Sequence, residues 1–330
     1  MANQIDKLNG IAIGDIAKFN GLEDSDIEKL NGLEFTGIVD FTWSTGGTLY
    51  AARSAHGAAG TRLAALSCGG GYASDAGEYN GATSTWTQSG VGSLSSSRGV
   101  FACGGSQGAA ITAGGQTASG AVDTVETYDG GTWQSEGAIN QATSALNGCG
   151  AGTSNTSFLM AGGDGYPGGS PLDATEVYSG GGGGSWSDGP TMVNATHYMM
   201  TFGASDDAFS IGGYGYPSAM NAVQHLSSGS WSVISETLVS YQRQQAGCFG
   251  TTSSALIVGG AGQHTNGDGW GDMATTEQWN GSAWALEDVY PGGTCDNAQG
   301  TGFRASATGG GLMWGGAPAS GPTDYTGEYG

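Results

Sequence analysis

The sequence predicts an all-β protein, a six-bladed β-propeller with four-stranded blades, from three observations. One unit recurs, consisting of a short apolar strand, a Gly-Gly pair, a polar loop, a second strand and a tryptophan, in residues 66–86, 111–133, 158–186, 209–231 and 256–284. The tryptophans of these units follow one another at intervals of 43 to 53 residues, beginning at Trp43. The 66 glycines among 330 residues stand at regular places between apolar strands. Repeats of this length are typical of propeller blades.

Each part of the unit has a physical role in such a blade. The four to six apolar or small residues before Gly-Gly suit a strand buried between neighbouring blades. The two glycines allow backbone conformations that are costly for other residues, and they let adjacent blades approach closely. The tryptophan is predicted on the outer strand, where its large side chain covers the gap to the next blade.

The last repeat predicts how the ring closes. It runs through Gly315-Gly316 to Glu328-Tyr329-Gly330 without a tryptophan. The missing outer strand is available at about 38–44, in the letters IVDFTW that end at Trp43. We therefore expect this N-terminal strand to complete the sixth blade, which leaves no exposed sheet edge. The predicted domains are an N-terminal segment, 1–34, and the propeller, 35–330.

The first 34 residues hold a separate repeat with an 11-residue step, whose three copies end in Lys-Leu-Asn-Gly, Lys-Phe-Asn-Gly and Lys-Leu-Asn-Gly. Acidic residues before two copies favour a helical start, and Asn-Gly would end each helical turn. Asn-Gly hairpin turns are the β alternative. Three copies are too few to bury a core alone. Nine apolar residues therefore need cover from another protein or another copy: Ile5, Leu8, Ile11, Ile16, Phe19, Leu22, Ile27, Leu30 and Leu33.

These Lys-(Leu/Phe)-Asn-Gly repeats resemble those at the N-termini of structural proteins from tailed bacteriophages, notably marine ones. The resemblance covers about 35 of the 330 residues. It implies a location in the virion, where residues 1–34 attach to other virion proteins and a display domain follows. We expect a head decoration or tail fibre that is present as a homo-oligomer on the particle and adheres to host surface glycans.

The Gly-Gly pair, the aromatic residue after an acidic one and the later tryptophan resemble the kelch repeat. That resemblance implies an alternative function, a copper oxidase of the galactose-oxidase type, which needs tyrosine, histidine and a cysteine crosslinked to tyrosine. The four histidines are scattered among the repeats: His56, His197, His225 and His264. We interpret His56 and His197 as ordinary polar residues at strand ends, and we expect no catalytic residue and no enzyme. A cellular protein-interaction propeller is a third hypothesis, which the N-terminal repeats disfavour.

The strongly negative net charge excludes nucleic acid and anionic membranes as expected partners. The formal net charge is −21, all three lysines lie in the first 29 residues, and residues 35–330 carry −17. Such a surface repels nucleic acid and anionic membranes, and no apolar run approaches the length of a membrane span. Arg53, Arg98 and Arg243 each stand seven residues before a glycine of an inner strand. Equivalent positions on separate blades do not make the converging arginine cluster of a sialidase.

The five cysteines are odd in number and lack a CxxC pair. We expect them to be small, reduced residues that fill space, because a metal site would need further ligands at matching positions.

Loops with aromatic residues are the candidate ligand contacts, since such residues stack on sugar rings or pack on a neighbouring protein. The four candidates are Tyr166, Tyr214, Tyr216 and Trp270. Loop 263–272 also offers three oxygen-bearing side chains as candidate calcium ligands, although without EF-hand spacing: Asn266, Asp268 and Asp272. We expect no other cofactor.

Overall fold

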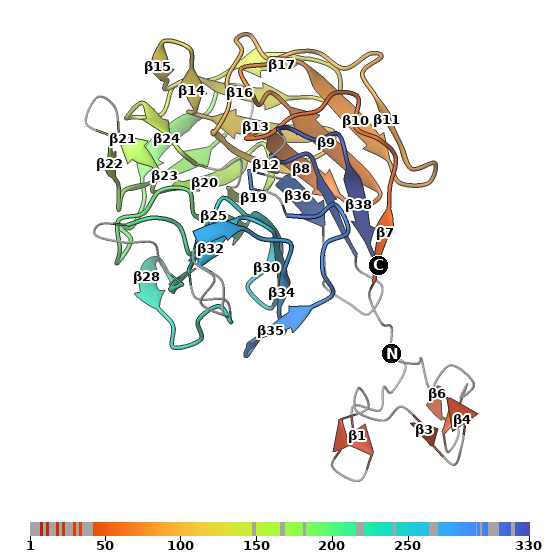
Figure 1. Ribbon diagram of the computed structural model, residues 1–330. Coiled ribbons are helices and arrows are strands. Elements are labelled where there is room, and N and C mark those ends of the chain that lie inside the picture. The colour runs from red at the N-terminus through yellow and green to blue at the C-terminus, as the bar shows by residue number, and fades with distance from the viewer. Residues whose placement is uncertain are drawn as a thin grey trace. The chain divides into compact units, whose positions relative to one another are not determined.

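The computed structural model divides the chain into two units, Met1–Thr42 and Trp43–Gly330 (Figure 1). It describes residues 42–146, 150–165, 169–180, 183–215, 221–239, 242–263, 270–294, 296–297, 299–302, 310–317 and 321–330, together with six two-residue strands between residues 7 and 34. These residues contain strands and turns but no helix, so the predicted all-β class is confirmed for them. None of them belongs to a helix able to cross a membrane.

The N-terminal unit contains three antiparallel strand pairs, so the β alternative is the one observed. The pairs are β1 (Lys7–Leu8) with β2 (Ile11–Ala12), β3 (Lys18–Phe19) with β4 (Leu22–Glu23), and β5 (Lys29–Leu30) with β6 (Leu33–Glu34). The registers are the same in each pair, Leu8↔Ile11, Phe19↔Leu22 and Leu30↔Leu33. Two residues, Asn-Gly in every copy, separate the paired positions, which is the spacing of the tightest hairpins. Ile5, Ile16 and Ile27 lie outside the described residues.

The described part of the second unit contains six antiparallel four-stranded sheets, the size of propeller blades. Sheet 1 consists of β8 (Gly57–Thr61), β9 (Ala64–Cys68), β10 (Ala76–Asn80) and β11 (Thr85–Thr87); sheet 2 of β12 (Ala102–Ser106), β13 (Ala109–Ala113), β16 (Val125–Tyr128) and β17 (Trp133–Ser135); sheet 3 of β19 (Ala151–Ser154), β20 (Ser157–Ala161), β23 (Thr175–Ser179) and β24 (Ser185–Asp188).

The remaining sheets follow the same order except for one strand. Sheet 4 consists of β25 (Met200–Ala204), β26 (Asp207–Ile211), β27 (Val223–Ser227) and β28 (Ser230–Val233); sheet 5 of β30 (Gly247–Thr251), β31 (Ser254–Val258), β34 (Thr276–Trp279) and β35 (Trp284–Glu287); sheet 6 of β36 (Gln299–Gly302), β37 (Gly311–Trp314), β38 (Thr326–Tyr329) and β7 (Trp43–Thr45). The fourth strand of sheet 6 therefore comes from the beginning of the unit, where β7 pairs with β38 in the register Tyr329↔Trp43. Within the predicted strand at 38–44, residues 38–41 lie outside the described residues.

The first strands of the sheets contact one another in succession. β8 contacts β12, β12 contacts β19, β19 contacts β25, β25 contacts β30, β30 contacts β36, and β36 contacts β8. Figure 1 shows these strands toward the middle of the unit, with the later strands of each sheet farther out.

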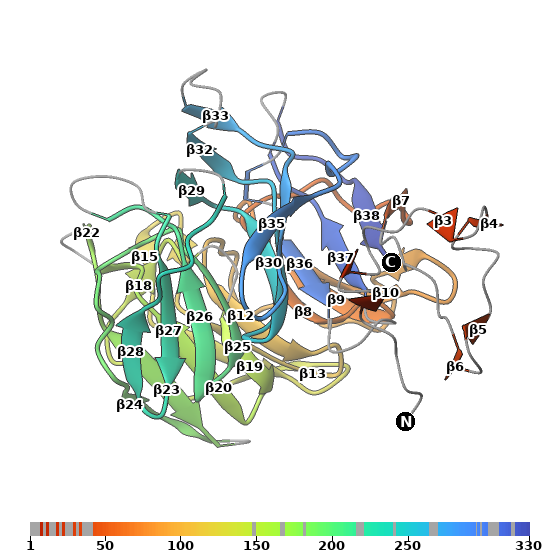
Figure 2. The same cartoon turned by 90° about the horizontal axis from the view of Figure 1, so that it is seen from below.

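Three smaller sheets extend the loops. They consist of β14 (Gln116–Thr117) with β15 (Gly120–Ala121); β18 (Thr143–Ser144), β21 (Asp164–Gly165) and β22 (Ser170–Pro171); and β29 (Gln242–Gln244), β32 (Ala261–Gln263) and β33 (Trp270–Asp272). Figure 2 shows β32 and β33 projecting beyond the strands of sheet 5. These extensions lie at the same end of the sheets as the connections that lead into the first strands. We call this end the linker face.

The core lies between neighbouring sheets. Ile111 of sheet 2 and Phe158 of sheet 3 share one buried cluster with Trp186, and Leu226 and Trp231 of sheet 4 share another with Leu159 of sheet 3. The six repeat tryptophans all stand on the fourth strand of their sheets, as predicted. The described cysteines are buried and form no disulfide with one another, which fits the predicted space-filling role: Cys68, Cys103 and Cys248. Cys149 and Cys295 lie outside the described residues.

The Gly-Gly pairs end the second strand of every sheet and have one conformation. The first glycine has φ between 60° and 67° and the second between 84° and 103°, at residues 69–70, 114–115, 162–163, 212–213, 259–260 and 315–316. At Gly114, a Cβ atom would lie 2.6 Å from the carbonyl oxygen of Thr143 in the connection to the next sheet. The predicted role of the glycines in close approach is therefore confirmed, because a side chain here would collide with backbone.

A polar side chain fastens the connection that precedes a sheet to the third strand of that sheet. We call these connections linkers 1 to 6: residues 46–56, 88–101, 136–150, 189–199, 234–246 and 288–298. In sheets 2 to 5, a linker N–H donates to a carboxylate or amide oxygen at 2.7–2.8 Å, in the pairs Ser95–Glu126, Asn140–Glu176, Asn194–Gln224 and Val239–Glu277.

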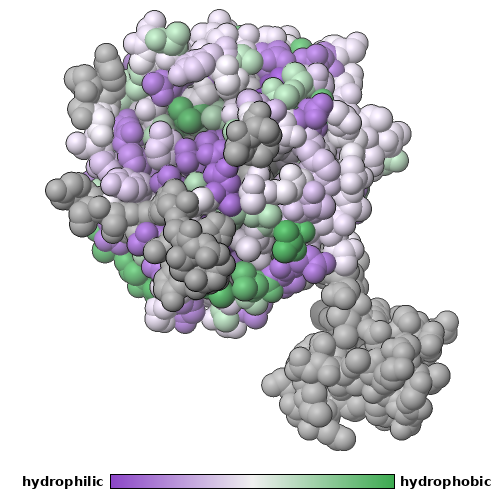
Figure 3. All heavy atoms as spheres, viewed as in Figure 1, coloured by the Kyte–Doolittle hydropathy of each residue, from purple (hydrophilic) through white to green (hydrophobic). Residues whose placement is uncertain are grey.

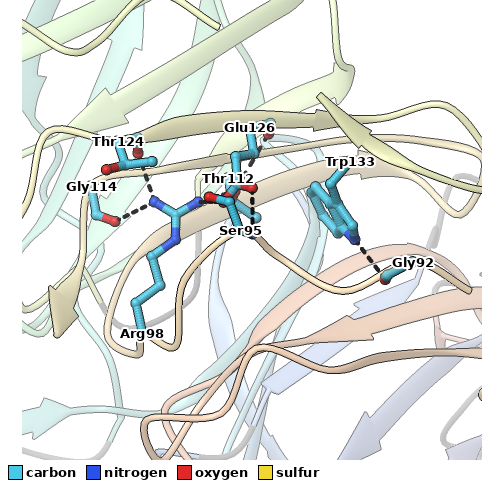
Figure 4. A network of polar contacts seen from close by, with 8 residues as sticks. All are labelled: Gly92, Ser95, Arg98, Thr112, Gly114, Thr124, Glu126 and Trp133. Carbon is cyan, nitrogen blue, oxygen red and sulfur yellow. Dashed lines mark hydrogen bonds and ion pairs between the residues drawn. The ribbon is translucent and has the colours of Figure 1, made fainter. Parts of the chain in front are cut away.

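Arginines complete this attachment in sheets 2 and 5. Arg98 donates to Glu126 at 2.8 Å and to the carbonyl oxygens of Gly114 and Thr124, with both charged side chains buried (Figure 4). Arg243 lies 3.1 Å from Glu277, and both are fully buried. Arg53 pairs in the same way with Asp75 at 2.7 Å. Each of the three arginines is therefore held by its own carboxylate, and they do not converge on one point. In sheet 3 no described arginine pairs with Glu176, and burial raises the pKa of this carboxyl.

Sheets 1 and 6 fill the same position with a tyrosine ring. Their third strands carry Gly77 and Gly327 in place of the acidic or amide residue. A Cβ atom at Gly77 would lie 2.2 Å from the ring of Tyr50 in linker 1, and one at Gly327 would lie 2.6 Å from the ring of Tyr290 in linker 6. Every sheet therefore has a contact between its third strand and its own linker, although the chemistry differs.

Removing β7 tests its place in sheet 6. We expect a chain starting at residue 42 to unfold cooperatively. A chain starting at residue 47 should melt lower by roughly 10 °C or aggregate, because β38 loses its partner strand. It also loses the packing of Trp43 on Tyr290 and Tyr329, whose ring centroids each lie 5.0 Å from that of Trp43. Calorimetry and light scattering of the two truncated proteins measure this. Equal melting would show that β7 contributes nothing to the sheet.

The buried ion pair of sheet 2 gives a second prediction. Arg98→Met should lower the free energy of unfolding by about 3–5 kcal/mol, because it leaves Glu126 buried without its cation. Adding Glu126→Gln should restore most of the loss, since Gln224 of sheet 4 accepts the linker N–H without an arginine. Urea unfolding at neutral pH is the measurement. A double variant as unstable as Arg98→Met alone would contradict the attachment role of the pair.

Candidate functional site

The linker face is built on a ring of left-handed backbone. Each linker contains one non-glycine residue with φ between 50° and 58°, close to its end: Ala55, Val100, Ala145, Tyr198, Gln245 and Asn297. Such a conformation costs about 1–2 kcal/mol for a residue with a Cβ. It persists here because these six segments bond to one another through the main chain.

The bonds run from each linker to the next at 2.7–3.0 Å. The donor and acceptor pairs are Val100 N–H to Ala55 O, Leu146 N–H to Val100 O, Tyr198 N–H to Ala145 O, Gln245 N–H to Tyr198 O, Asn297 N–H to Gln245 O and Ala55 N–H to Asn297 O. The last bond returns to the first linker. The backbone of all six positions is therefore fixed independently of their side chains.

The side chains on this ring divide it into two halves. Ala55, Val100 and Ala145 are small and apolar, whereas the next three in order, Tyr198, Gln245 and Asn297, are larger and polar. We call these last three residues the polar arc. All three are half-buried, and the Gln245 amide donates to the Asn297 side-chain oxygen at 3.2 Å.

Aromatic residues and a histidine stand beside the polar arc. The ring of His197 lies 4.8 Å from that of Tyr198 and 5.4 Å from that of Tyr214, centroid to centroid. Nδ1 of His197 bonds to the carboxylate of Asp164 from β21, which fixes the imidazole against the two tyrosines. Tyr214 is 39% exposed, so one of its faces is open to a ligand.

The electrostatic character of this region is acidic. Burial, followed by the charges of Asp164 and Tyr72, raises the pKa of Tyr198. Burial, followed by the charge of Asp272, raises the pKa of Asp296, the residue next to Asn297. Asp164 and Asp296 thus lie beside the polar arc, and Asp272 acts on Asp296. Figure 3 shows hydrophilic residues gathered near the middle of the Trp43–Gly330 unit, with hydrophobic ones scattered between them.

The arrangement suits recognition of a polyhydroxylated ligand. Amide, carboxylate and phenol groups donate to and accept from hydroxyls, while the exposed tyrosine face stacks on a sugar ring. Among the described residues no group of three or more His, Cys, Asp or Glu side chains is arranged to hold a metal ion.

The predicted candidates are only partly within the described residues. Tyr214 lies at the site, and Asp272 lies in β33, electrostatically coupled to Asp296. The backbone of Trp270 belongs to β33. Tyr166, Tyr216, Asn266 and Asp268 lie outside the described residues, as does His264.

Two histidines differ from the interpretation as ordinary polar residues at strand ends. His197 is held by Asp164 at the polar arc, and His56 is fully buried with no hydrogen-bond partner in the described part of the chain. The polar arc itself was not predicted. Aligning the linkers on the glycine of each first strand would have found it, because the ring residue stands five positions before Gly60, Gly105, Gly203, Gly250 and Gly302.

A cavity of about 370 Å³ opens at the opposite end of the first strands. Its lining includes Thr61, Ser106 and Thr251, with Phe202 and Cys248 among the other wall residues. Its charged residue among those described, Asp207, already bonds to His225 and Thr252. We therefore place the candidate site at the polar arc, where polar and aromatic groups gather.

Comparison of the whole chain with protein-family models finds no match, and comparison with curated proteins finds none either.

Proposed function

We propose that residues 43–330 are a six-bladed β-propeller whose sixth blade is completed by β7. The proposal is supported by the likeness of the contacts on both sides of sheet 6. Nε1 of Trp43 donates to Thr276 of sheet 5 at 3.2 Å, and Nε1 of Trp86 in sheet 1 donates to the matching Thr326 of sheet 6 at 3.0 Å. Gly316 N–H donates to Arg53 O of linker 1, as Gly70 N–H does to Arg98 O of linker 2.

This propeller is, in our proposal, a structural protein of a bacteriophage virion, and residues 1–34 attach it to the particle. The observation that carries the proposal is the separate N-terminal unit with three strand pairs of identical register. Two-residue strand pairs have too few contacts to be stable alone. A series of identical pairs is suited to dock on a repetitive surface, on other virion proteins or on further copies of the chain.

The displayed propeller has no catalytic role in this proposal and adheres to host surface glycans through the polar arc. The support is chemical: half-buried amides and tyrosines beside an exposed aromatic face, on a rigid backbone ring. A closed ring also leaves the propeller monomeric when it is separated from the N-terminal unit, so oligomers form on the particle.

The attachment proposal predicts different fates for the full chain and for residues 43–330. Both should be soluble and fold, but only the full chain should be found in particles assembled in its presence, because the docking surface lies in residues 1–34. Mass spectrometry of purified virions measures incorporation. Efficient incorporation of residues 43–330 would move the docking surface to the propeller and overturn the proposal.

The adhesion proposal predicts binding in an array of neutral, amino and acidic saccharides. Neutral or amino saccharides should bind in preference to acidic ones, because Asp164, Asp272 and Asp296 are near the polar arc. Tyr214→Ala and Tyr198→Asn should each weaken binding roughly tenfold, while Leu63→Ser, an exposed control in the β8–β9 turn, should not. Asparagine tolerates the left-handed backbone, as Asn297 shows. Preferred binding of acidic saccharides, or equal loss in the control, would contradict the site.

A further inference from the structure

His56 occupies the contact between sheets 6 and 1. It is the last residue of linker 1, directly after Ala55 of the backbone ring, and is 0% exposed. Its ring lies 6.0 Å from that of Trp314 in sheet 6, centroid to centroid. A Cβ atom at Gly70 of sheet 1 would lie 2.5 Å from His56 Cβ, and one at Gly315 of sheet 6 would lie 2.6 Å from His56 Cε1. The imidazole therefore fills a tight space between the two Gly-Gly turns.

The other linkers place apolar residues here. The residue after the left-handed position is Phe101, Leu146, Met199 and Ala246 in linkers 2 to 5, and all four are buried hydrophobic side chains. The corresponding residue of linker 6 lies outside the described residues. Among these five described linkers, the one between sheets 6 and 1 alone carries a titratable group at this core position.

Neither ring nitrogen of His56 has a hydrogen-bond partner among the described residues. Arg53 of its own linker is the charged group that acts on it most directly, and it pairs with Asp75. In the neighbouring linkers, Arg98 pairs with Glu126, and Asp296 is half-buried near Asp272. The ring of Tyr50 lies against Arg53, and burial raises the pKa of this phenol, so it stays neutral. No described carboxylate accepts a hydrogen bond from the imidazole, so an imidazolium here would be buried without a counterion.

We propose that His56 makes the contact between sheets 6 and 1 an acid-sensitive seam: protonation expels the imidazole from the core, and the two sheets separate locally while the other contacts hold. Expulsion breaks the packing of His56 on Trp314 and loosens the bond from Gly316 N–H to Arg53 O. The neutral imidazole behaves as a core residue, as Phe101 does in linker 2.

Linkage gives the direction of the effect. Burial, followed by the charge of Arg53, holds the pKa of His56 well below its ordinary value. An imidazole in the opened seam has an ordinary pKa of about 6.5, so the opened state binds the proton more strongly. The contribution to closure is complete above that pKa and is lost as the pH falls below it. At pH 5.0, the equilibrium constant for opening should be about 30-fold larger than at pH 7.5.

Hydrogen exchange of the full chain at pH 7.5 and 5.0, corrected for the intrinsic exchange chemistry, tests this proposal. The seam reporters are the amides of Gly316 and Ala55, and the matched reporter between sheets 3 and 4 is the amide of Gly163, which donates to Thr196 O. We expect protection at the seam to fall about 30-fold at the lower pH and protection at Gly163 to stay within a few-fold. Equal changes at both contacts, or none, would overturn the proposal.

Variants separate His56 from other acid effects. His56→Phe copies Phe101, and His56→Leu copies Leu146, so one variant remains if the other does not fold. Either should abolish the pH dependence at the seam. His225→Gln, a partly exposed histidine of sheet 4, is the control and should leave it unchanged. Persistence of the pH-dependent seam opening in a folded His56 variant would assign the opening to another group.

Discussion

The close passage of each linker over the preceding Gly-Gly pair is the constraint on which the second unit depends. The carbonyl oxygen of Arg243 lies 2.3 Å from where a Cβ atom of Gly212 would be, and the amide of Gly213 donates to that same oxygen. No residue with a side chain satisfies both conditions. The sheets are therefore held to one another by backbone at the linker face, and the apolar contacts between them fill the space that this backbone contact defines.

Much of this fold could be predicted because its signals are local and repeated. Gly-Gly and the outer tryptophan recur with every sheet, and each acts through its own conformational freedom or size. The linker attachments could not be predicted in this way, because different solutions serve one position: a carboxylate with or without an arginine, an amide, or a tyrosine ring over a glycine. In the N-terminal unit, Leu8 pairs with Ile11 across two intervening residues, which is a hairpin and not a helical turn.

The candidate site was predictable only in its aromatic part. Tyr214 was predicted because an aromatic residue on a glycine-containing loop suits stacking on a sugar ring, whereas Gln245 and Asn297 are polar residues of a kind common in any loop. Their importance comes from a left-handed backbone and a hydrogen-bonded ring that assemble from linkers about 50 residues apart. His56 was interpreted as an ordinary polar residue at a strand end because of its residue type. It occupies a buried position that is apolar in the equivalent linkers.

The ring of left-handed residues separates the shape of the scaffold from the identity of the groups it presents. Because main-chain atoms make every bond of the ring, exchanging one of its side chains leaves the frame in place. Alanine, valine, tyrosine, glutamine and asparagine are all accommodated there already. The side chains at these six positions can vary while the framework stays constant, as they do in the variable loops of an antibody. A lineage carrying this scaffold can change the side chains that it presents by point substitution, while the backbone frame stays the same.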